Sequence, residues 1–279
     1  MPTAFLFASH MTSWSVRRTY RHLVRDLDGC GDVFWLLDVT DDAQRPRGVA
    51  RVHPFSLNEL NQLGYPFEVT HLVPGNVHLS MVHFAHAHPQ YDRIWFIEYD
   101  VRFTGHWDDI VRAVQQDPSD FLTTRVMRHH QKPSWYWWSS LKHPTEHIPK
   151  SARLRAFNPF CRISRNALMH VHQKQLDGWE GHNEVLVTTL LDQADYRIGD
   201  MSGKGAYGAP SVDRPWYIRK DTFGWRPSRW QVGDRSNTLY HPVKPATWFY
   251  RSYRDEASKW LRDLIRPQAR RLLRLIREL

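Results

Sequence analysis

The chain has 279 residues, of which 41% are hydrophobic and 24% charged, so its composition is that of a folded protein and excludes general disorder. The length is enough for one large α/β domain, which we expect over 1–250, followed by a basic tail over 251–279. Two cysteines and no stretch of about 18 apolar residues argue against a disulfide framework and a membrane-spanning helix. The first apolar run, Ala4–Ala8, is too short for a signal peptide. We therefore expect a cytoplasmic protein.

The predicted elements alternate between strands and helices along the chain. In order they are strand 4–8, helix 16–27, strand 32–38, a proline-rich irregular stretch over 40–75 with a short strand at 67–69, helix 77–88, strand 93–97, helix 107–116, strand 121–124, an aromatic loop over 129–150, strand 157–163, helix 165–172, and helix 183–191. Such an alternation is typical of an α/β sheet fold, with the aromatic loop inserted over the strand ends.

The net charge of +9 is concentrated at the C-terminus. Residues 251–279 hold nine Lys/Arg and four Asp/Glu, and beyond Pro267 leucines recur at helical spacing opposite a row of arginines. This pattern is typical of a basic amphipathic helix that lies on an anionic membrane surface. A closing helix packed on the domain fits the pattern equally well. The first alternative would make the protein peripheral at the inner face of the membrane.

Two carboxylates follow the most apolar predicted strand, 93–97. Glu98 and Asp100 are separated by one residue, so along an extended strand they point to the same side. Ligands of open α/β sheets bind beyond the carboxyl ends of the strands. Two carboxylates there repel one another unless a cation neutralises them, and Mg²⁺ or Mn²⁺ prefers oxygen ligands that include substrate phosphates. The pair predicts a divalent metal site, although two solvated acids in a turn would give the same pattern.

This segment also resembles a known family. A helix, Tyr91-Asp92, an apolar strand and an acidic-x-acidic tip are similar to the D-x-D region of GT-A type nucleotide-sugar glycosyltransferases. The run W-F-I-E-Y-D-V-R-F-T-G over 95–105 resembles one uncharacterised group of them. The resemblance implies a Rossmann-like mixed sheet flanked by helices. It also implies a hexosyltransferase that uses Mn²⁺ or Mg²⁺ to move a sugar from a nucleotide-sugar donor, with a UDP-sugar favoured, to a glycan or glycolipid.

The family's site positions can be carried over residue by residue. The first acid of the motif is Glu98 instead of Asp, so the resemblance implies Asp100 as the metal ligand and Glu98 as a residue at the bound donor. The end of the first strand contacts the nucleobase in this fold, which implies Ala8 and Ser9. Asp38, which ends the second strand, is expected to contact the nucleoside.

A late proline-closed stretch, 237–244, supplies two further candidates. GT-A enzymes commonly bring a late histidine back to the metal, which by position implies His241. A buried, hydrogen-bonded histidine is the alternative. Lys244 is expected to meet a phosphate oxygen of the donor.

A second acidic cluster lies over 177–184, just before a predicted helix. It resembles the G-W-G-x-E-D acceptor and base motif of β-1,4-galactosyltransferase-like enzymes, with His182 and Asn183 where that motif has Glu and Asp. The resemblance implies Glu180 or Glu184 as the general base that an inverting transferase needs. Acids that merely stabilise the first turn of a helix would give the same cluster, and a retaining enzyme would need no such base.

Two other classes of function compete with this interpretation. A non-enzymatic carbohydrate- or nucleic-acid-binding protein would account for the net charge and the 13 tryptophans. A nucleotidyltransferase on a similar sheet would share the metal chemistry, but it commonly has a glycine-rich loop after the first strand, and this chain has none there. No helix-turn-helix, zinc module or RNP-like motif occurs, so we expect no nucleic-acid partner.

Overall fold

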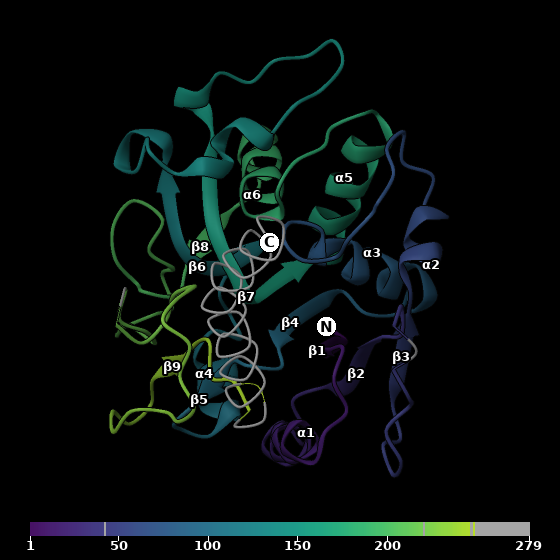
Figure 1. The fold of residues 1–279 in the computed structure, drawn as a ribbon. Coiled ribbons are helices and arrows are strands. Elements are labelled where there is room, and N and C mark those ends of the chain that lie inside the picture. The colour runs from purple at the N-terminus through teal and green to yellow at the C-terminus, as the bar shows by residue number, and fades with distance from the viewer. Residues whose placement is uncertain (42, 220, 246–247, 249–279) are drawn as a thin grey trace, which may run out of the picture.

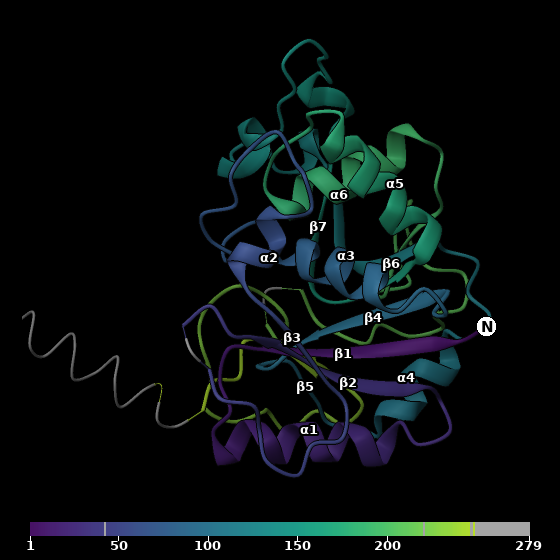
Figure 2. The same cartoon turned by 90° about the vertical axis from the view of Figure 1, so that its right-hand side faces the viewer.

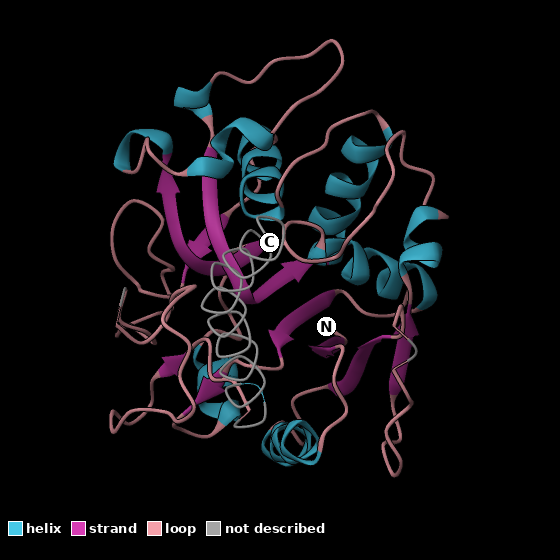
Figure 3. Cartoon of the chain, viewed as in Figure 1, coloured by secondary structure: helices cyan, strands magenta, loops and turns pink. Residues whose placement is uncertain are grey.

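The computed structural model describes residues 1–41, 43–219, 221–245 and 248. Its strands are β1 (Thr3–Ser9), β2 (Asp32–Asp38), β3 (Val52–Phe55), β4 (Arg93–Glu98), β5 (Arg102–Phe103), β6 (Phe121–Arg128), β7 (Leu154–Ser164), β8 (Ile198–Asp200) and β9 (Leu239–Tyr240). Its helices are α1 (Trp14–Asp26), α2 (Leu57–Asn61), α3 (Val77–Ala87), α4 (Trp107–Ala113), α5 (Arg165–Leu176) and α6 (Asn183–Gln193), with short 3₁₀ turns at His129–Gln131, Tyr136–Ser140 and Lys150–Ala152. Figures 1 and 3 show their arrangement.

The predicted basic tail over 251–279 lies outside the described residues. Within the part of the chain that the structure describes, no helix is both long and apolar enough to cross a bilayer.

A seven-stranded sheet forms the centre of the molecule, with the strand order β3-β2-β1-β4-β7-β6-β8. The first four strands of this order are parallel, β7 is antiparallel to both β4 and β6, and β8 is parallel to β6. A second, two-stranded sheet pairs β5 with β9. The expected Rossmann-like α/β architecture with a mixed sheet flanked by helices is therefore confirmed.

Helices cover both faces of the large sheet. In Figure 2 α1 and α4 lie on one side, and α2, α3, α5 and α6 lie on the other. Each face has its own apolar core: Phe5 and Phe7 of β1 belong to the cluster beneath α1, whereas Ala4 and Leu6 belong to the cluster beneath α3. Strands buried on both faces must be apolar at every position, which explains why β1, β2 and β4 have continuous apolar runs.

The proline-rich stretch differs from its prediction. The expected strand at 67–69 is wrong. The backbone of Val69 bonds to the side-chain amide of Asn61 instead of a neighbouring strand: the amide donates to the Val69 carbonyl at 3.1 Å and accepts from the Val69 N–H at 2.7 Å. The real strand here is β3, which contains Pro54. Proline removes a hydrogen-bond donor, so it is tolerated in β3 because this strand is at the edge of the sheet.

The register of the parallel strands brings three strand ends to one edge. Ala8 pairs with Glu98 across β1 and β4, and Ser9 pairs with Leu37 across β1 and β2. The backbone amide of Tyr99 continues this ladder with a 2.9 Å bond to the carbonyl of Ala8. The ends of β1, β2 and β4 therefore meet where ligands of α/β sheets bind.

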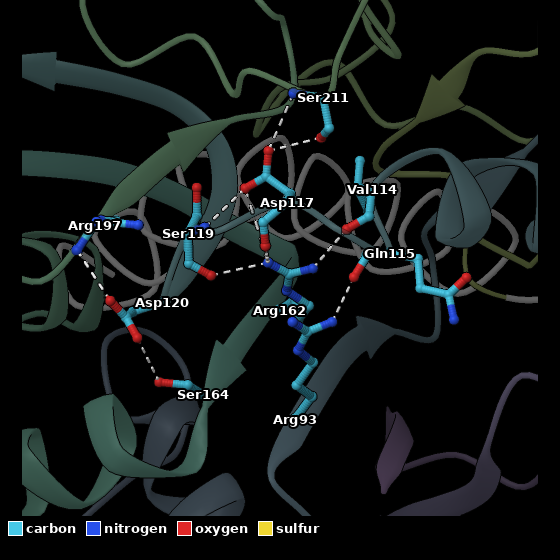
Figure 4. A network of polar contacts seen from close by, with 10 residues as sticks. All are labelled: Arg93, Val114, Gln115, Asp117, Ser119, Asp120, Arg162, Ser164, Arg197 and Ser211. Carbon is cyan, nitrogen blue, oxygen red and sulfur yellow. Dashed lines mark hydrogen bonds and ion pairs between the residues drawn. The ribbon is translucent and has the colours of Figure 1, made fainter. Parts of the chain in front are cut away.

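A buried arginine at the opposite end of β7 fixes the connection between α4 and β6. Arg162, 2% exposed, donates to the carbonyls of Val114, Asp117 and Ser119 at 2.7–2.9 Å (Figure 4). The Asp117 carboxylate in turn accepts from the Ser211 hydroxyl at 2.7 Å. These bonds satisfy buried carbonyls that no regular strand or helix pairs.

We predict that Arg162→Met lowers the free energy of unfolding by about 3–5 kcal/mol, because it leaves the carbonyls of Asp117 and Ser119 without a donor and removes the buried cation beside the Asp117 carboxylate. Urea unfolding followed by tryptophan fluorescence measures this. Arg112→Met is the matched control: Arg112 is exposed and pairs with Asp108 on α4, and its loss should cost no more than about 0.5 kcal/mol. Equal midpoints for the two variants would contradict the prediction.

Candidate metal centre

Three potential metal ligands converge at the edge where β1, β2 and β4 end. Glu98 is the last residue of β4, Asp100 follows two residues later, and His241 directly follows β9. One ligand atom from each lies within 4.8 Å of the others. The small sheet makes this possible, because Arg102 of β5 pairs with Tyr240 of β9 and so carries the late segment back to the acidic pair.

The ring of His241 is held with Nε2 toward the carboxylates. Its Nδ1 lies 2.8 Å from the Gly224 carbonyl, which can only accept, so Nδ1 carries the proton. Nε2 lies 3.4 Å from a carboxylate oxygen of Glu98 and 3.4 Å from Asp100 Oδ1. Burial alone would lower the pKa of His241, but Asp100 and Glu98 outweigh it and raise the pKa to about 10. The site thus attracts a cation strongly.

Asp100 is 1% exposed and has two differently placed oxygens. Oδ2 lies 2.5 Å from Lys244 Nζ, which also donates to the Tyr99 hydroxyl at 3.0 Å. Oδ1 is buried and has no hydrogen-bond partner among the described residues. Burial opposes ionisation of Asp100, but His241 and Lys244 together hold its pKa well below the usual value. A charged oxygen in the interior that makes no hydrogen bond and faces an imidazole nitrogen at 3.4 Å can serve as a metal ligand together with that nitrogen.

This donor set fits a divalent metal. Asp100 Oδ1, a Glu98 oxygen and His241 Nε2 provide two hard oxygens and one imidazole nitrogen, which suits Mn²⁺ or Mg²⁺. The hydrogen bond from Nδ1 to a backbone carbonyl is the usual support of a ligating histidine. The sequence predicted a metal site from the pair Glu98 and Asp100, with Asp100 as the ligand and Glu98 at the bound donor, and the structure brings both carboxylates within ligand reach.

The predicted nucleotide residues lie beside this centre. Ala8 pairs with Glu98 in the sheet, and the Ser9 hydroxyl closes a turn by accepting from the Met11 amide at 2.9 Å. Asp38 accepts from the Thr40 amide at 3.0 Å. Sequence reasoning missed His10, whose ring packs edge-on against Tyr99 at 5.4 Å. Among 17 histidines, only its place directly after the first strand could have singled it out.

The two candidate bases differ in their surroundings. Glu184 lies in the first turn of α6 with its side chain 15% exposed, and one of its oxygens accepts from Arg155 at 2.7 Å. Burial raises the pKa of Glu184 to about 7 against the opposing charges of Arg155 and Arg125, and the charges of Glu98 and His241 also reach it. Glu180 pairs instead with the exposed Lys142 at 2.7 Å. Only Glu184 is electrostatically linked to the metal centre.

The G-W-x-G spacing that suggested an acceptor motif has a packing explanation. Gly178 adopts φ +115°, and a Cβ at Gly181 would come 3.0 Å from the backbone of Ser140 and Leu141. Trp179 is 2% exposed and belongs to the core. The two glycines and the tryptophan are therefore explained by the packing of a tight turn. Of this segment, only the carboxylates of Glu180 and Glu184 remain candidates for a chemical role.

Comparisons with known proteins are sparse for this chain. A family model described as a protein of unknown function, DUF3405, matches residues 57–118. No curated protein matches the sequence.

Among solved structures, a glycosyltransferase involved in the glycosylation of the major capsid of PBCV-1 is similar over 62% of this chain and 65% of its own, with 8% identity and a TM-score of 0.32. This chain thus spans just under two thirds of that protein. Mouse xyloside xylosyltransferase 1 in its apo form is similar over 69% and 81%, with 11% identity and a TM-score of 0.38. The 4-diphosphocytidyl-2C-methyl-D-erythritol synthase of Anaerococcus prevotii DSM 20548 is similar over 76% and 91%, with 8% identity and a TM-score of 0.40. At such low scores these likenesses do not bear on the activity of this chain.

We predict that Mn²⁺ raises the Tm of the protein and that Asp100→Asn abolishes this rise, because the amide cannot replace a charged oxygen ligand. Scanning fluorimetry across a Mn²⁺ titration measures the effect. Asp108→Asn removes a half-buried carboxylate that pairs with Arg112 on α4, away from the proposed ligands, and should keep the full response. A Mn²⁺-dependent rise of the same size in Asp100→Asn would place the ion elsewhere.

Proposed function

We propose that this chain is a metal-dependent glycosyltransferase of the GT-A type. It would move a sugar from a nucleoside-diphosphate sugar, preferably a UDP-sugar, to a hydroxyl of a glycan or glycolipid. The observation that carries the proposal is the grouping of Glu98, Asp100 and His241 at the carboxyl edge of the sheet, where the buried Asp100 Oδ1 makes no hydrogen bond to the described residues and faces His241 Nε2 at 3.4 Å. Cytoplasmic residence, with attachment to anionic membrane through 251–279, belongs to the same proposal.

Different residues of the centre would bind different parts of the nucleotide-sugar donor. Asp100, His241 and Glu98 would hold Mn²⁺ or Mg²⁺, which supplies positive charge to the departing diphosphate when bound. Lys244 has its Nζ at the same carboxylate and would bind a phosphate oxygen. The nucleoside would lie against the ends of β1 and β2, at Ala8, Ser9 and Asp38.

Acceptor activation is assigned to one of two carboxylates. A base must be deprotonated yet basic enough to take a hydroxyl proton, and a pKa near 7 meets both needs at neutral pH. Glu184 has such a pKa because it is largely buried, and it senses the charges of the metal centre. Glu180, paired with Lys142 at 2.7 Å, is the second candidate. We therefore favour Glu184 as the general base of an inverting transfer.

Calorimetry with UDP and Mn²⁺ tests the metal and donor roles. The wild-type protein should bind UDP only when Mn²⁺ is present, and Asp100→Ala should weaken this binding at least about 100-fold because it removes a direct metal ligand. Asp108→Ala is the control and should bind as the wild type does. If UDP binds equally well with and without Mn²⁺, or unchanged in Asp100→Ala, the proposed function is wrong.

The pH dependence of transfer tests the base. Glu184 acts only when deprotonated, so kcat/KM should fall about tenfold per pH unit below an apparent pKa of about 7 and level off above it. Glu184→Gln should lose the activity, whereas Glu180→Gln should keep both the rate and the profile. A rate that stays constant down to pH 5 would exclude Glu184, and loss of turnover in Glu180→Gln would transfer the role to that residue.

A further inference from the structure

A second group of charges, in which three arginines meet the carboxylates of Glu184 and Asp200, lies near the metal centre. Arg125 of β6, Arg155 of β7 and Arg219 interact electrostatically with one another, and Glu184 interacts with both Arg125 and Arg155. Asp200 also interacts with Arg125, so two carboxylates face three guanidinium groups. The group thus keeps a small excess of positive charge, on the side where Arg219 is exposed, and a bound anion would neutralise it.

The two strand arginines have unused donors. Arg155 is 4% exposed, and its Nη2 donates to Glu184 at 2.7 Å while its guanidinium lies 3.8 Å from the centre of the Trp135 ring. The guanidinium of Arg125 lies 5.5 Å from the centre of the Phe157 ring. The Nε atoms of Arg125 and Arg155 are buried and have no hydrogen-bond acceptor within the described part of the chain. Unpaired buried donors of this kind indicate a hydrogen-bond acceptor that the polypeptide itself does not supply.

The backbone holds Arg125 in an unusual conformation. It has φ 55° and lies where the β6–β7 register shifts between Thr124 and Met127. Its amide donates to the Tyr217 hydroxyl at 2.7 Å, and that hydroxyl donates to the Asp200 carboxylate at 2.8 Å. Left-handed backbone at a non-glycine residue persists only where the surroundings enforce it, and such positions cluster at binding sites. The bulge thus orients a side chain at this place.

The arginine group adjoins the metal centre. The ring of Phe157, beneath Arg125, lies 5.3 Å from the ring of His241. Gly224, whose carbonyl orients His241, lies so close to Arg125 that an added Cβ would be 3.3 Å from its Nη1. One aromatic ring therefore separates Arg125 from His241, the ligand that would face the metal. A substrate reacting at the metal centre could reach both with neighbouring groups.

We propose that Arg125, Arg155 and Arg219 form an oxyanion subsite that binds a carboxylate or phosphate carried by a sugar, in addition to the diphosphate of the donor. Guanidinium groups suit planar carboxylates and phosphates because their donors form paired, charge-assisted hydrogen bonds. The diphosphate has its own partners in the metal and Lys244, so the arginines serve a different group. Describing the sugar as a substrate rests on the proposed function, whereas the binding of the anion does not.

Two pairs of probes distinguish where the anionic group is carried. Comparing the binding of UDP-glucuronic acid with that of UDP-glucose, each with Mn²⁺, tests whether the anionic group is on the transferred sugar. Methyl glucuronide and glucose 6-phosphate against methyl glucoside, with or without saturating UDP and Mn²⁺, ask whether it is on the acceptor. Calorimetry should show at least about tenfold tighter binding of the charged member in one of the two pairs.

Variants then assign the preference to the arginines. Arg125→Gln and Arg219→Gln should each remove the preference for the charged probe while Mn²⁺-dependent UDP binding persists. Arg219 is exposed, so its variant remains informative if the change at Arg125 impairs folding. Arg112→Gln, which removes one exposed arginine from α4, should keep the preference.

The outcomes separate this inference from the proposed function. If charged and neutral probes bind alike in both pairs, or if the preference persists in both variants, the subsite is wrong. It is also wrong if both variants merely weaken binding of UDP itself, since the arginines would then serve the diphosphate. If UDP fails to bind while methyl glucuronide or glucose 6-phosphate binds in an Arg219-dependent manner, the subsite stands and the glycosyltransferase proposal falls.

Discussion

The buried carboxylate of Asp100 is the constraint on which the functional edge of this protein depends. An isolated charge in the interior costs several kcal/mol, so it requires partners. Lys244 and His241 supply them from a segment that is distant in sequence, at 2.5 and 3.4 Å. The amide of Val243 adds a 2.8 Å bond to the Asp100 carbonyl. The same contacts that neutralise Asp100 therefore also attach the late segment, with its β9 strand, to the end of β4.

Two groups of charges lie near Phe157, one around the carboxylates of Glu98 and Asp100 and one around the three arginines. On one side Glu98 and Asp100 attract cations, and on the other the arginine group attracts anions, with the rings of Phe157 and His241 between them. Under the proposed function, a nucleotide sugar would bring its diphosphate and its sugar to these two groups, so both would act on one bound molecule. Burial is the main cause of the raised pKa of Glu184, and charges from both groups act on it as well.

Several features that the sequence linked to function are explained by packing. Trp179 is a core residue, and the glycines at 178 and 181 permit the close approach of the turn to Ser140 and Leu141. Arg162 likewise serves architecture, because its donors satisfy the carbonyls of the α4–β6 connection. A tryptophan or a buried arginine can thus have either a structural role or a role at a binding site. Only the residues that it contacts show which role it has.

Local signals in the sequence were sufficient for the α/β architecture and for the acidic pair. Continuous apolar runs identify β1, β2 and β4, and the single residue between Glu98 and Asp100 places both carboxylates on one side of a strand end. The edge strand β3 was not predicted, because Pro54 disfavours the assignment of a strand from the sequence. The pairing of β5 with β9, which brings His241 and Lys244 to Asp100, depends on contacts across more than 130 residues. The arginine group arises in the same way, since it joins a bulge in β6, a neighbouring strand and a distant loop. Such groupings were decided by the tertiary structure alone, because the strand pairing and the ion pairs that create them join segments that are close only when the chain is folded.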